Sequence, residues 1–212
     1  MHETWAVDKI VNVQRTTDIF AHQKLTFSFE LFPPKTEEGH LKLLNTLHGL
    51  SALKPDFISC TYGAGGGSRE KTLDIVEQIQ NHHHIPSVAH LTCVLNTKNE
   101  IKDILTEMKQ RGICNVLALR GDAPMDNPNW TPGKNNFKYS WELVAFIREH
   151  FKDHFSIGVA GYFPKKERRT TIQMIRDQDM QNAMATAGMN LKTREKISFG
   201  FYHTMLMNTS HK

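Results

Sequence analysis

Short apolar runs alternate with amphipathic segments through the first three quarters of the chain, and this alternation restricts the fold more than any other feature. Five runs rich in Phe, Ile and Val are typical of strands buried on both faces; they span residues 26–32, 56–62, 87–93, 115–120 and 156–162. Helical spacing of apolar residues marks the segments between them, at 40–53, 70–80, 99–110 and 140–151. Repeated strand–helix units predict a parallel sheet with helical crossovers, an α/β fold.

Two architectures contain such units. A doubly wound dinucleotide-binding sheet has a GxGxxG turn after its first strand, whereas residues 32–35 read Phe-Pro-Pro-Lys. A (β/α)8 barrel assembles its chemistry at the carboxyl ends of its strands. Polar residues stand at those ends here: Glu30, Thr61, His90, Thr92, Asp122 and Tyr162. We therefore expect a TIM-type (β/α)8 barrel that is incomplete, with about five βα units recognisable.

Composition excludes several other classes. The chain has 212 residues, of which 39% are hydrophobic and 23% charged, as in ordinary globular domains. No apolar run has the roughly 18 residues of a membrane span, no secretory signal is visible, and a net charge of +4 is too small to indicate nucleic-acid binding. Cys60, Cys93 and Cys114 form no CxxC pair. We expect no disulfide framework, no metal site and a cytoplasmic location.

The composition changes after Tyr162. Residues 163–212 carry nine basic and four acidic residues, six of the nine methionines and no valine, whereas residues 1–162 carry 17 basic and 18 acidic residues. Such a shift indicates a boundary. We expect an N-terminal extension or helix over residues 1–24, the barrel segment over 25–162, and an atypical basic, Met-rich tail over 163–212.

One carboxylate lies in an otherwise aromatic and apolar strand. Glu30, between Phe29 and Leu31, should be desolvated, and desolvation raises a carboxyl pKa toward the range of a general acid. The alternative is a structural carboxylate paired with a buried Lys or Arg. His90, also in a strand, is either a satisfied core histidine or a functional one.

Two loops add polar groups. The glycine-rich residues 61–68 would let backbone N–H groups approach a ligand closely, or form a flexible turn. Arg120, Gly121 and Asp122 could hold an anion and face a polar ligand, or form a local Arg–Asp pair around a glycine turn. The Pro/Gly/Asn-rich residues 127–136 could cover a pocket, and Ser140 is expected to cap the following helix.

Five strings in this order resemble the 5,10-methylenetetrahydrofolate reductase family. They are FSFELFPPKTEEG, PDFISCTYGAGGGSREKT, PSVAHLTC, VLALRGDAP and SIGVAGY, and they span about residues 25–162. The resemblance implies a flavoprotein (β/α)8 barrel that moves a hydride from NADH or NADPH to FAD and then to methylenetetrahydrofolate. The product, 5-methyltetrahydrofolate, serves methionine synthesis. The resemblance also implies a homo-oligomer once the barrel is complete, with neither nucleic acid nor membrane as partner.

Individual roles follow from that resemblance. Glu30 matches the general acid that opens the imidazolidine ring of the folate. Asp122 matches the aspartate beside flavin and pterin that tunes the flavin and contacts the folate. Thr61 matches a contact to the nicotinamide, so Thr61 and Asp122 are the expected substrate-binding residues. The positions that match flavin contacts are Thr61, Tyr62, Ala64, His90, Arg120, Gly121, Asp122, Ser140 and Tyr162.

The resemblance breaks after the fifth expected strand, where the family has Tyr-Pro-Glu and this chain has Phe163-Pro-Lys-Lys. Out-of-frame translation of a reductase gene would explain the break and the unusual tail. We then expect a poorly active fragment of the enzyme. The alternatives are a non-catalytic half-barrel or partner subunit, and, ranked last, a lyase that needs a Schiff-base lysine at a strand end, because Lys35 lies in a loop.

Overall fold

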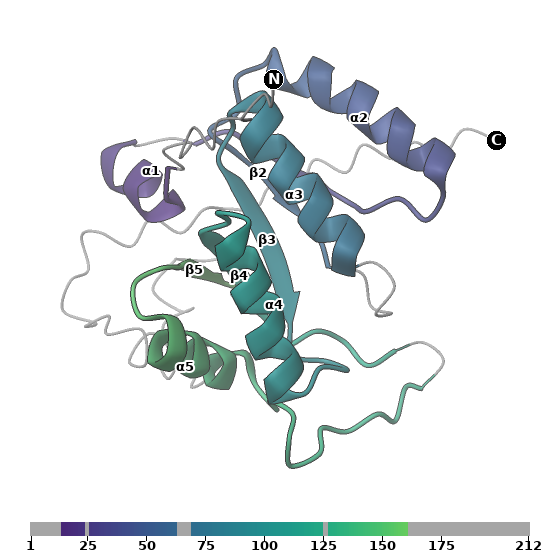
Figure 1. Ribbon diagram of the computed structural model, residues 1–212, viewed down its shortest axis with the longest axis vertical. Helices are drawn as coiled ribbons and strands as arrows, with labels where there is room; N and C mark the ends of the chain where they lie inside the picture. The colour runs from purple at the N-terminus through teal and green to yellow at the C-terminus, as the bar shows by residue number, and fades with distance from the viewer. Residues whose placement is uncertain (1–13, 24–25, 63–68, 125–126, 161–212) are drawn as a thin grey trace, which may run out of the picture.

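The computed structural model describes residues 14–23, 26–62, 69–124 and 127–160. Helices and strands alternate along this part of the chain (Figure 1). In chain order they are α1 (Thr16–His22), β1 (Ser28–Leu31), α2 (Glu37–Ser51), β2 (Phe57–Cys60), α3 (Arg69–His83), β3 (Ser87–Thr92), α4 (Lys98–Gln110), β4 (Asn115–Leu119), α5 (Ser140–Phe151) and β5 (Ser156–Val159).

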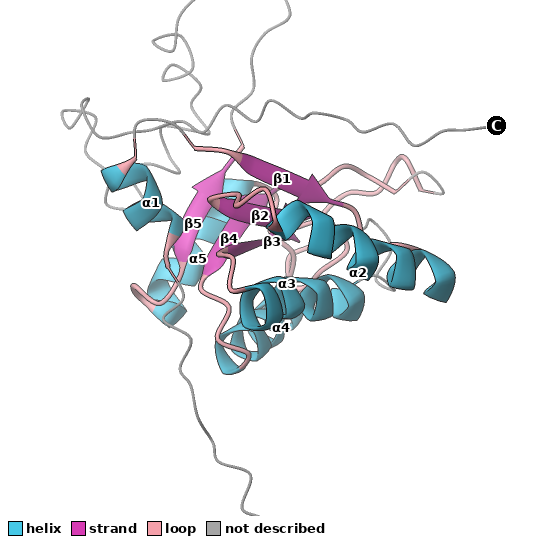
Figure 2. Cartoon of the chain, turned by 90° about the horizontal axis from the view of Figure 1, so that it is seen from above, coloured by secondary structure: helices cyan, strands magenta, loops and turns pink. Residues whose placement is uncertain are grey.

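The five strands form one parallel sheet in the order β1-β2-β3-β4-β5. A doubly wound sheet reverses its strand order at a switch point, whereas a barrel adds each strand beside the previous one. Figure 2 shows α2, α3 and α4 together on one side of this sheet. The α/β fold expected from the sequence is therefore confirmed, and the arrangement is that of part of a (β/α)8 barrel.

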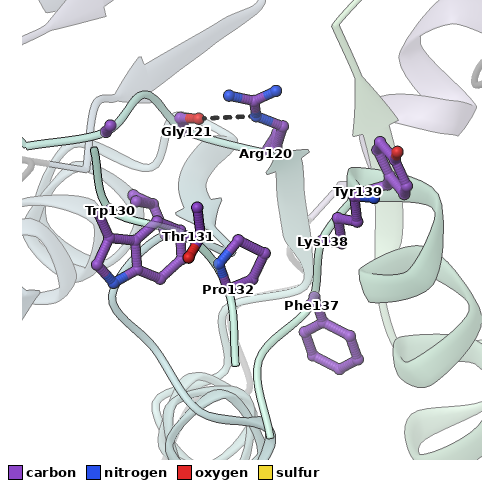
Figure 3. A pocket seen from close by; sticks show the side chains of 10 residues that line it. Arg120, Gly121, Trp130, Thr131, Pro132, Phe137, Lys138 and Tyr139 are labelled. Carbon is purple, nitrogen blue, oxygen red and sulfur yellow. Dashed lines mark hydrogen bonds between the residues drawn. The ribbon is translucent and has the colours of Figure 1, made fainter. Parts of the chain in front are cut away.

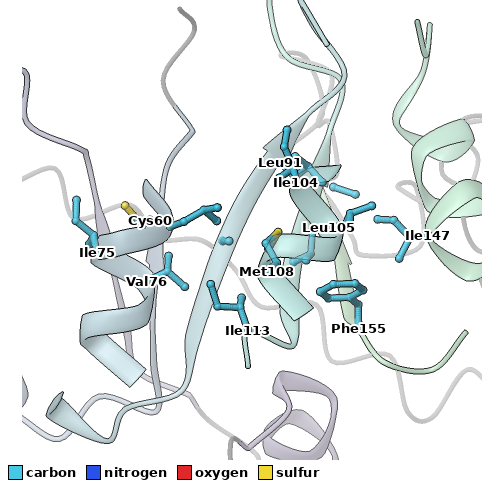
Figure 4. Packing of buried hydrophobic residues seen from close by; sticks show 14 of the residues in the cluster. Cys60, Ile75, Val76, Leu91, Ile104, Leu105, Met108, Ile113, Ile147 and Phe155 are labelled. Atoms are coloured by element: carbon cyan, nitrogen blue, oxygen red, sulfur yellow. The ribbon is translucent and has the colours of Figure 1, made fainter. Parts of the chain in front are cut away.

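The two faces of the sheet have different neighbours. One face packs against the crossover helices in the main core, through residues such as Ile58, Leu91 and Val116. Figure 4 shows Leu91 within this core. The alternate residues Phe57, Val88 and Leu117 form a second cluster with Ile19 of α1. Because side chains alternate along a strand, the face with α1, here called the inner face, also carries Glu30, His90 and Thr92.

Helix α1 is fixed to the amino ends of the strands by a buried polar network. The backbone N–H of Thr16 donates to Asn115 Oδ1 at 2.8 Å, and the Thr16 and Ser156 hydroxyls lie 2.8 Å apart. Ser156 Oγ also accepts from the Thr17 N–H, and Asn115 Nδ2 donates to the Ser87 carbonyl at 3.1 Å. The network joins α1 to three strands, within the segment predicted as an N-terminal extension or helix.

The amino-terminal ends of α2 and α5 are set by capping interactions that the sequence analysis did not predict. The spacing of leucines predicts a helix from residue 40, but α2 begins at Glu37 because Thr36 Oγ1 accepts from the Gly39 N–H. Ser140 was expected to cap α5, and this is wrong. The cap position is Tyr139, whose N–H donates to the Glu142 carboxylate at 3.0 Å. A glutamate reaching back satisfies the free N–H groups of the first turn without a serine cap.

All three cysteines are buried free thiols. Burial raises the pKa of Cys60 and of Cys93 to about 12, so both remain protonated at neutral pH. Cys60 and Cys93 pack as small apolar side chains in the helix-facing core. Across the described ranges, no helix combines the length and apolarity needed to cross a membrane.

Candidate functional site

Glu30 and His90 meet on the inner face of the sheet. His90 Nε2 lies 3.5 Å from Glu30 Oε2, and the two side chains are 7% and 20% exposed, respectively. They come from β1 and β3, with β2 between these strands. Both residues lie toward the carboxyl ends of their strands. The fold thus brings together an acid and an imidazole that are 60 positions apart in the sequence.

Burial affects the two groups in opposite directions. It raises the pKa of the Glu30 carboxyl above its ordinary value and lowers the pKa of His90 to about 4. His90 is therefore neutral near pH 7 and supplies no positive charge that would favour the Glu30 carboxylate. Among the described residues, no Lys or Arg forms an ion pair with Glu30. The desolvation expected from the sequence is present, and it raises the pKa of Glu30.

Two buried polar atoms of β3 have no hydrogen-bond partner in the part of the chain that the structure describes. They are His90 Nε2 and Thr92 Oγ1. Both side chains lie on the inner face, two residues apart. A buried polar atom without a partner costs about 1–3 kcal/mol, so most such atoms in proteins are paired. Unpaired atoms at the carboxyl ends of barrel strands indicate positions where a bound molecule supplies the missing bonds.

The turn after β4 requires glycine. Gly121 has a φ of +80°, and a Cβ placed there would lie 2.6 Å from Val94 Cγ1 and 3.1 Å from Thr92 Cβ. The absence of a side chain therefore lets this backbone lie directly against the end of β3. Arg120 Nε donates to the Gly121 carbonyl at 3.3 Å.

Arg120 and Asp122 are both exposed and do not pair with each other. The alternative of a local Arg–Asp ion pair is therefore wrong. Asp122 follows the carboxyl end of β4, and Glu30 lies near the carboxyl end of β1. Because the sheet is parallel, the two carboxyl groups belong to the same end of it. Both charges at the β4 turn are left available to a ligand.

A pocket of about 250 Å³ lies beside this turn (Figure 3). Its strand side contains Val94, Arg120, Gly121 and Ala123. Its other side is the connection to α5, with Trp130, Thr131, Pro132, Phe137, Lys138 and Tyr139. Two cations and several aromatic rings suit an anionic group and a flat ring. Pockets for whole small molecules have about 300–1,000 Å³, so this one fits part of a larger ligand.

The loop over residues 127–136 lines this pocket through Trp130, Thr131 and Pro132. Lys138 and Phe137 were not singled out from the sequence. Their only signal is their place between this loop and α5. The end of the loop is held by Asn136, whose Nδ2 donates to the Asn96 carbonyl at 2.9 Å.

The other predicted site residues are distributed as follows. Thr61 follows β2; its N–H donates to the Leu31 carbonyl at 2.8 Å and its carbonyl accepts from Thr72 Oγ1. Tyr62, the next residue, is half-buried. Ser140 begins α5 directly after Tyr139, but it does not line the pocket. Ala64 and Tyr162 lie outside the described residues.

The sheet is of the barrel type, and ionisable groups and unpaired polar atoms lie at the carboxyl ends of its strands. These features are typical of TIM-barrel proteins that bind a ligand at that end. A family model described as methylenetetrahydrofolate reductase matches residues 15–194. The chain belongs to this family. The match continues beyond Tyr162, where the motif strings quoted above end.

Curated relatives agree with that assignment. Methylenetetrahydrofolate reductase 1 of Schizosaccharomyces pombe is 42% identical over 141 residues, which are 66% of this chain and 23% of the relative. A probable methylenetetrahydrofolate reductase (NADH) of Oryza sativa subsp. japonica is 39% identical over 150 residues, 71% of this chain and 25% of that protein. The 5,10-methylenetetrahydrofolate reductase of Escherichia coli is 37% identical over 140 residues, 66% of this chain and 44% of that protein. The chain thus spans less than half the length of these relatives.

Proposed function

We propose that this chain carries the proton-donating and flavin-holding part of a methylenetetrahydrofolate reductase. The reaction is the reduction of 5,10-methylenetetrahydrofolate to 5-methyltetrahydrofolate with NADH or NADPH, a step of one-carbon metabolism. The single observation that carries the proposal is the half-buried Glu30 beside the neutral His90 on the inner face. The name of the rice relative specifies NADH, which favours NADH as the reductant here.

Glu30 acts as the general acid. Opening of the imidazolidine ring needs a proton on the ring nitrogen that leaves the bridging carbon; the carbon–nitrogen bond then breaks and an iminium remains on the substrate. Glu30 keeps this proton to a higher pH than an exposed glutamate because burial raises its pKa. Asp122 supplies an exposed carboxylate at the same end of the sheet, which stabilises cationic states of the folate.

Three features of the site support FAD as the proposed cofactor. The unpaired His90 Nε2 offers a polar contact, Gly121 permits a close backbone approach, and Arg120 with Lys138 suits phosphates next to aromatic rings. When bound, FAD relays a hydride from the reduced nicotinamide to the folate. Thr61, Tyr62, Ala64, Ser140 and Tyr162 join these residues as proposed flavin contacts on the strength of the family match.

The described strands also bear on how active the chain is alone. Strands β1 and β5 each pair with a single neighbour in the described sheet, so two strand edges are open. We propose that the chain by itself turns over substrate slowly and that completion of the barrel gives an active homo-oligomer in the cytoplasm. Sequencing the gene through codons 155–175 tests the frame shift. An open, family-like continuation in another reading frame supports it, and its absence excludes it.

The test of the proposed function is FAD binding by the purified 212-residue chain, followed by visible absorbance and by quenching of the bound flavin's fluorescence. Production of radiolabelled 5-methyltetrahydrofolate with NADH gives the turnover. We expect a yellow protein with slow turnover that depends on added FAD. A colourless protein with no measurable FAD affinity would contradict the proposal.

A further inference from the structure

We propose that Thr92 is a further ligand-binding residue of this site, whose hydroxyl forms a hydrogen bond with the polar edge of the flavin ring. This inference rests on the proposed function, since it takes the ligand to be a flavin. It assigns a role to a residue that the family resemblance did not single out.

The position of Thr92 is the first support. It is the last residue of β3 and pairs in register with Leu119 of β4. Leu91 and Cys93, its neighbours in sequence, belong to the helix-facing core. Because side chains alternate along a strand, Thr92 lies on the inner face, about 7 Å along the strand from His90.

Its surroundings place it between the two parts of the site. Gly121 packs against both Thr92 and Val94. Val94 lines the pocket that contains Arg120, whereas His90 contacts Glu30. A ligand that extends from the acid to the cationic pocket along β3 therefore passes Thr92.

The missing partner is the second, independent support. Thr92 is 8% exposed, and its Oγ1 makes no hydrogen bond in the part of the chain that the structure describes. Buried hydroxyls elsewhere in the sheet are bonded; Ser156 Oγ pairs with Thr16 Oγ1 of α1, and Ser87 Oγ donates to Gln80 Oε1. A valine of nearly the same shape would fill this position without an unpaired polar atom.

The chemistry of the hydroxyl suits the proposed ligand. A threonine hydroxyl donates one hydrogen bond and accepts others. The isoalloxazine ring presents carbonyl oxygens, ring nitrogens and an N–H along one edge. Thr92 can therefore serve either a donor or an acceptor there, and binding would give the buried oxygen the partner it lacks.

The experiment compares three variants of the 212-residue chain by fluorescence titration with FAD and by thermal unfolding without FAD. Thr92→Val removes the hydroxyl and keeps the shape of the side chain, so FAD affinity should fall about tenfold. The midpoint of thermal unfolding without FAD should be unchanged or higher. Thr92→Ser keeps the hydroxyl and loses a methyl group, so the midpoint should fall while FAD affinity stays within about twofold of wild type. Ser87→Ala, at the amino end of the same strand, is the matched control and should leave FAD affinity unchanged.

If Thr92 contributed through packing alone, Thr92→Val should bind FAD more tightly than Thr92→Ser. Should Thr92→Val bind FAD as tightly as wild type, or Thr92→Ser bind it more weakly than Thr92→Val, the inference is wrong while the proposed function stands. If the wild-type chain binds no FAD, the proposed function fails and the inference fails with it.

Discussion

The two ends of the sheet treat their buried polar groups differently. At the amino end, Asn115, Ser156 and Thr16 bond to one another and to neighbouring backbone groups. At the carboxyl end, His90 Nε2 and Thr92 Oγ1 have no partner among the described residues. In (β/α)8 barrels the amino end serves stability and the carboxyl end serves chemistry. His154 Nε2, in the turn before β5, is also unpaired among the described residues, so the contrast concerns the strand residues alone. Within the strands, these buried polar groups are bonded at the amino end and unpaired at the carboxyl end, where a ligand can bond to them.

The largest effect on turnover is expected from the acid at the carboxyl end. Glu30→Gln keeps the size of the side chain but cannot donate an acidic proton. Turnover, measured as labelled 5-methyltetrahydrofolate, should fall by about 100-fold or more. FAD affinity should stay within about twofold of wild type, because the substitution leaves the shape of the site intact. Unchanged turnover would show that Glu30 is not the proton donor.

The matching change at the amino end should affect stability alone. Asn115→Ala removes the acceptor of the Thr16 N–H and the donor to the Ser87 carbonyl, and it leaves both groups buried. We expect a loss of about 3–4 kcal/mol in the free energy of unfolding, from urea denaturation. The FAD affinity of the folded fraction should not change. A stability loss under about 1 kcal/mol would mean that the network does not hold α1 in place.

His90 should make the carboxyl end sensitive to acid. Its pKa is lowered from 6.5 to about 4 by burial, so below pH 6.5 the unfolded chain takes up a proton that the folded chain resists. The stability contribution of the neutral imidazole is complete above pH 6.5 and is lost as the pH falls toward 4, by up to about 3 kcal/mol. Urea denaturation between pH 7 and 4 should show a shallower loss for His90→Gln than for wild type. His82→Gln, at an exposed histidine, is the control. An equal dependence of the free energy of unfolding on pH in all three proteins would refute the prediction.

The smallest effect is expected at the β4 turn. Gly121→Ala places a Cβ at a φ of +80° and within 2.6 Å of Val94. Strain in the left-handed region and this contact should cost about 2 kcal/mol of stability and weaken FAD binding about tenfold. Gly133→Ala, in the exposed loop before α5, provides a comparison at a glycine without a positive φ. Wild-type behaviour of Gly121→Ala would show that the close approach of the turn to β3 is not needed.

The sequence was sufficient for most of the helices and strands, and it predicts that the candidate site residues lie at the carboxyl ends of the strands. Apolar runs and helical spacing do not depend on distant contacts, so the α5 range was predicted as observed. The faces of the strands could not be predicted, because runs such as residues 57–60 are apolar on both sides. Only the structure shows that His90 turns toward Glu30 and that Ile58 turns toward the helices.

Contacts between distant residues explain what the sequence did not reveal. The role proposed for Thr92 depends on a missing partner and on Gly121, 29 positions away. Lys138 and Phe137 join Arg120 in the pocket because the loop folds back over the β4 turn. Ser140 was misassigned as a cap because Glu142 satisfies the free N–H groups of the first turn. Such relations are set by tertiary geometry and leave no local pattern.

The most direct test of the proposed acid is a pH titration of the Glu30 carboxyl carbon by NMR in the chain labelled with ¹³C-glutamate, with Glu30→Gln to assign the signal. The expected result is a Glu30 pKa clearly above 4.5 and a His90 pKa well below 6.5. A Glu30 signal that titrates at or below 4.5 would contradict the claim that this end of the sheet stores a proton for the folate.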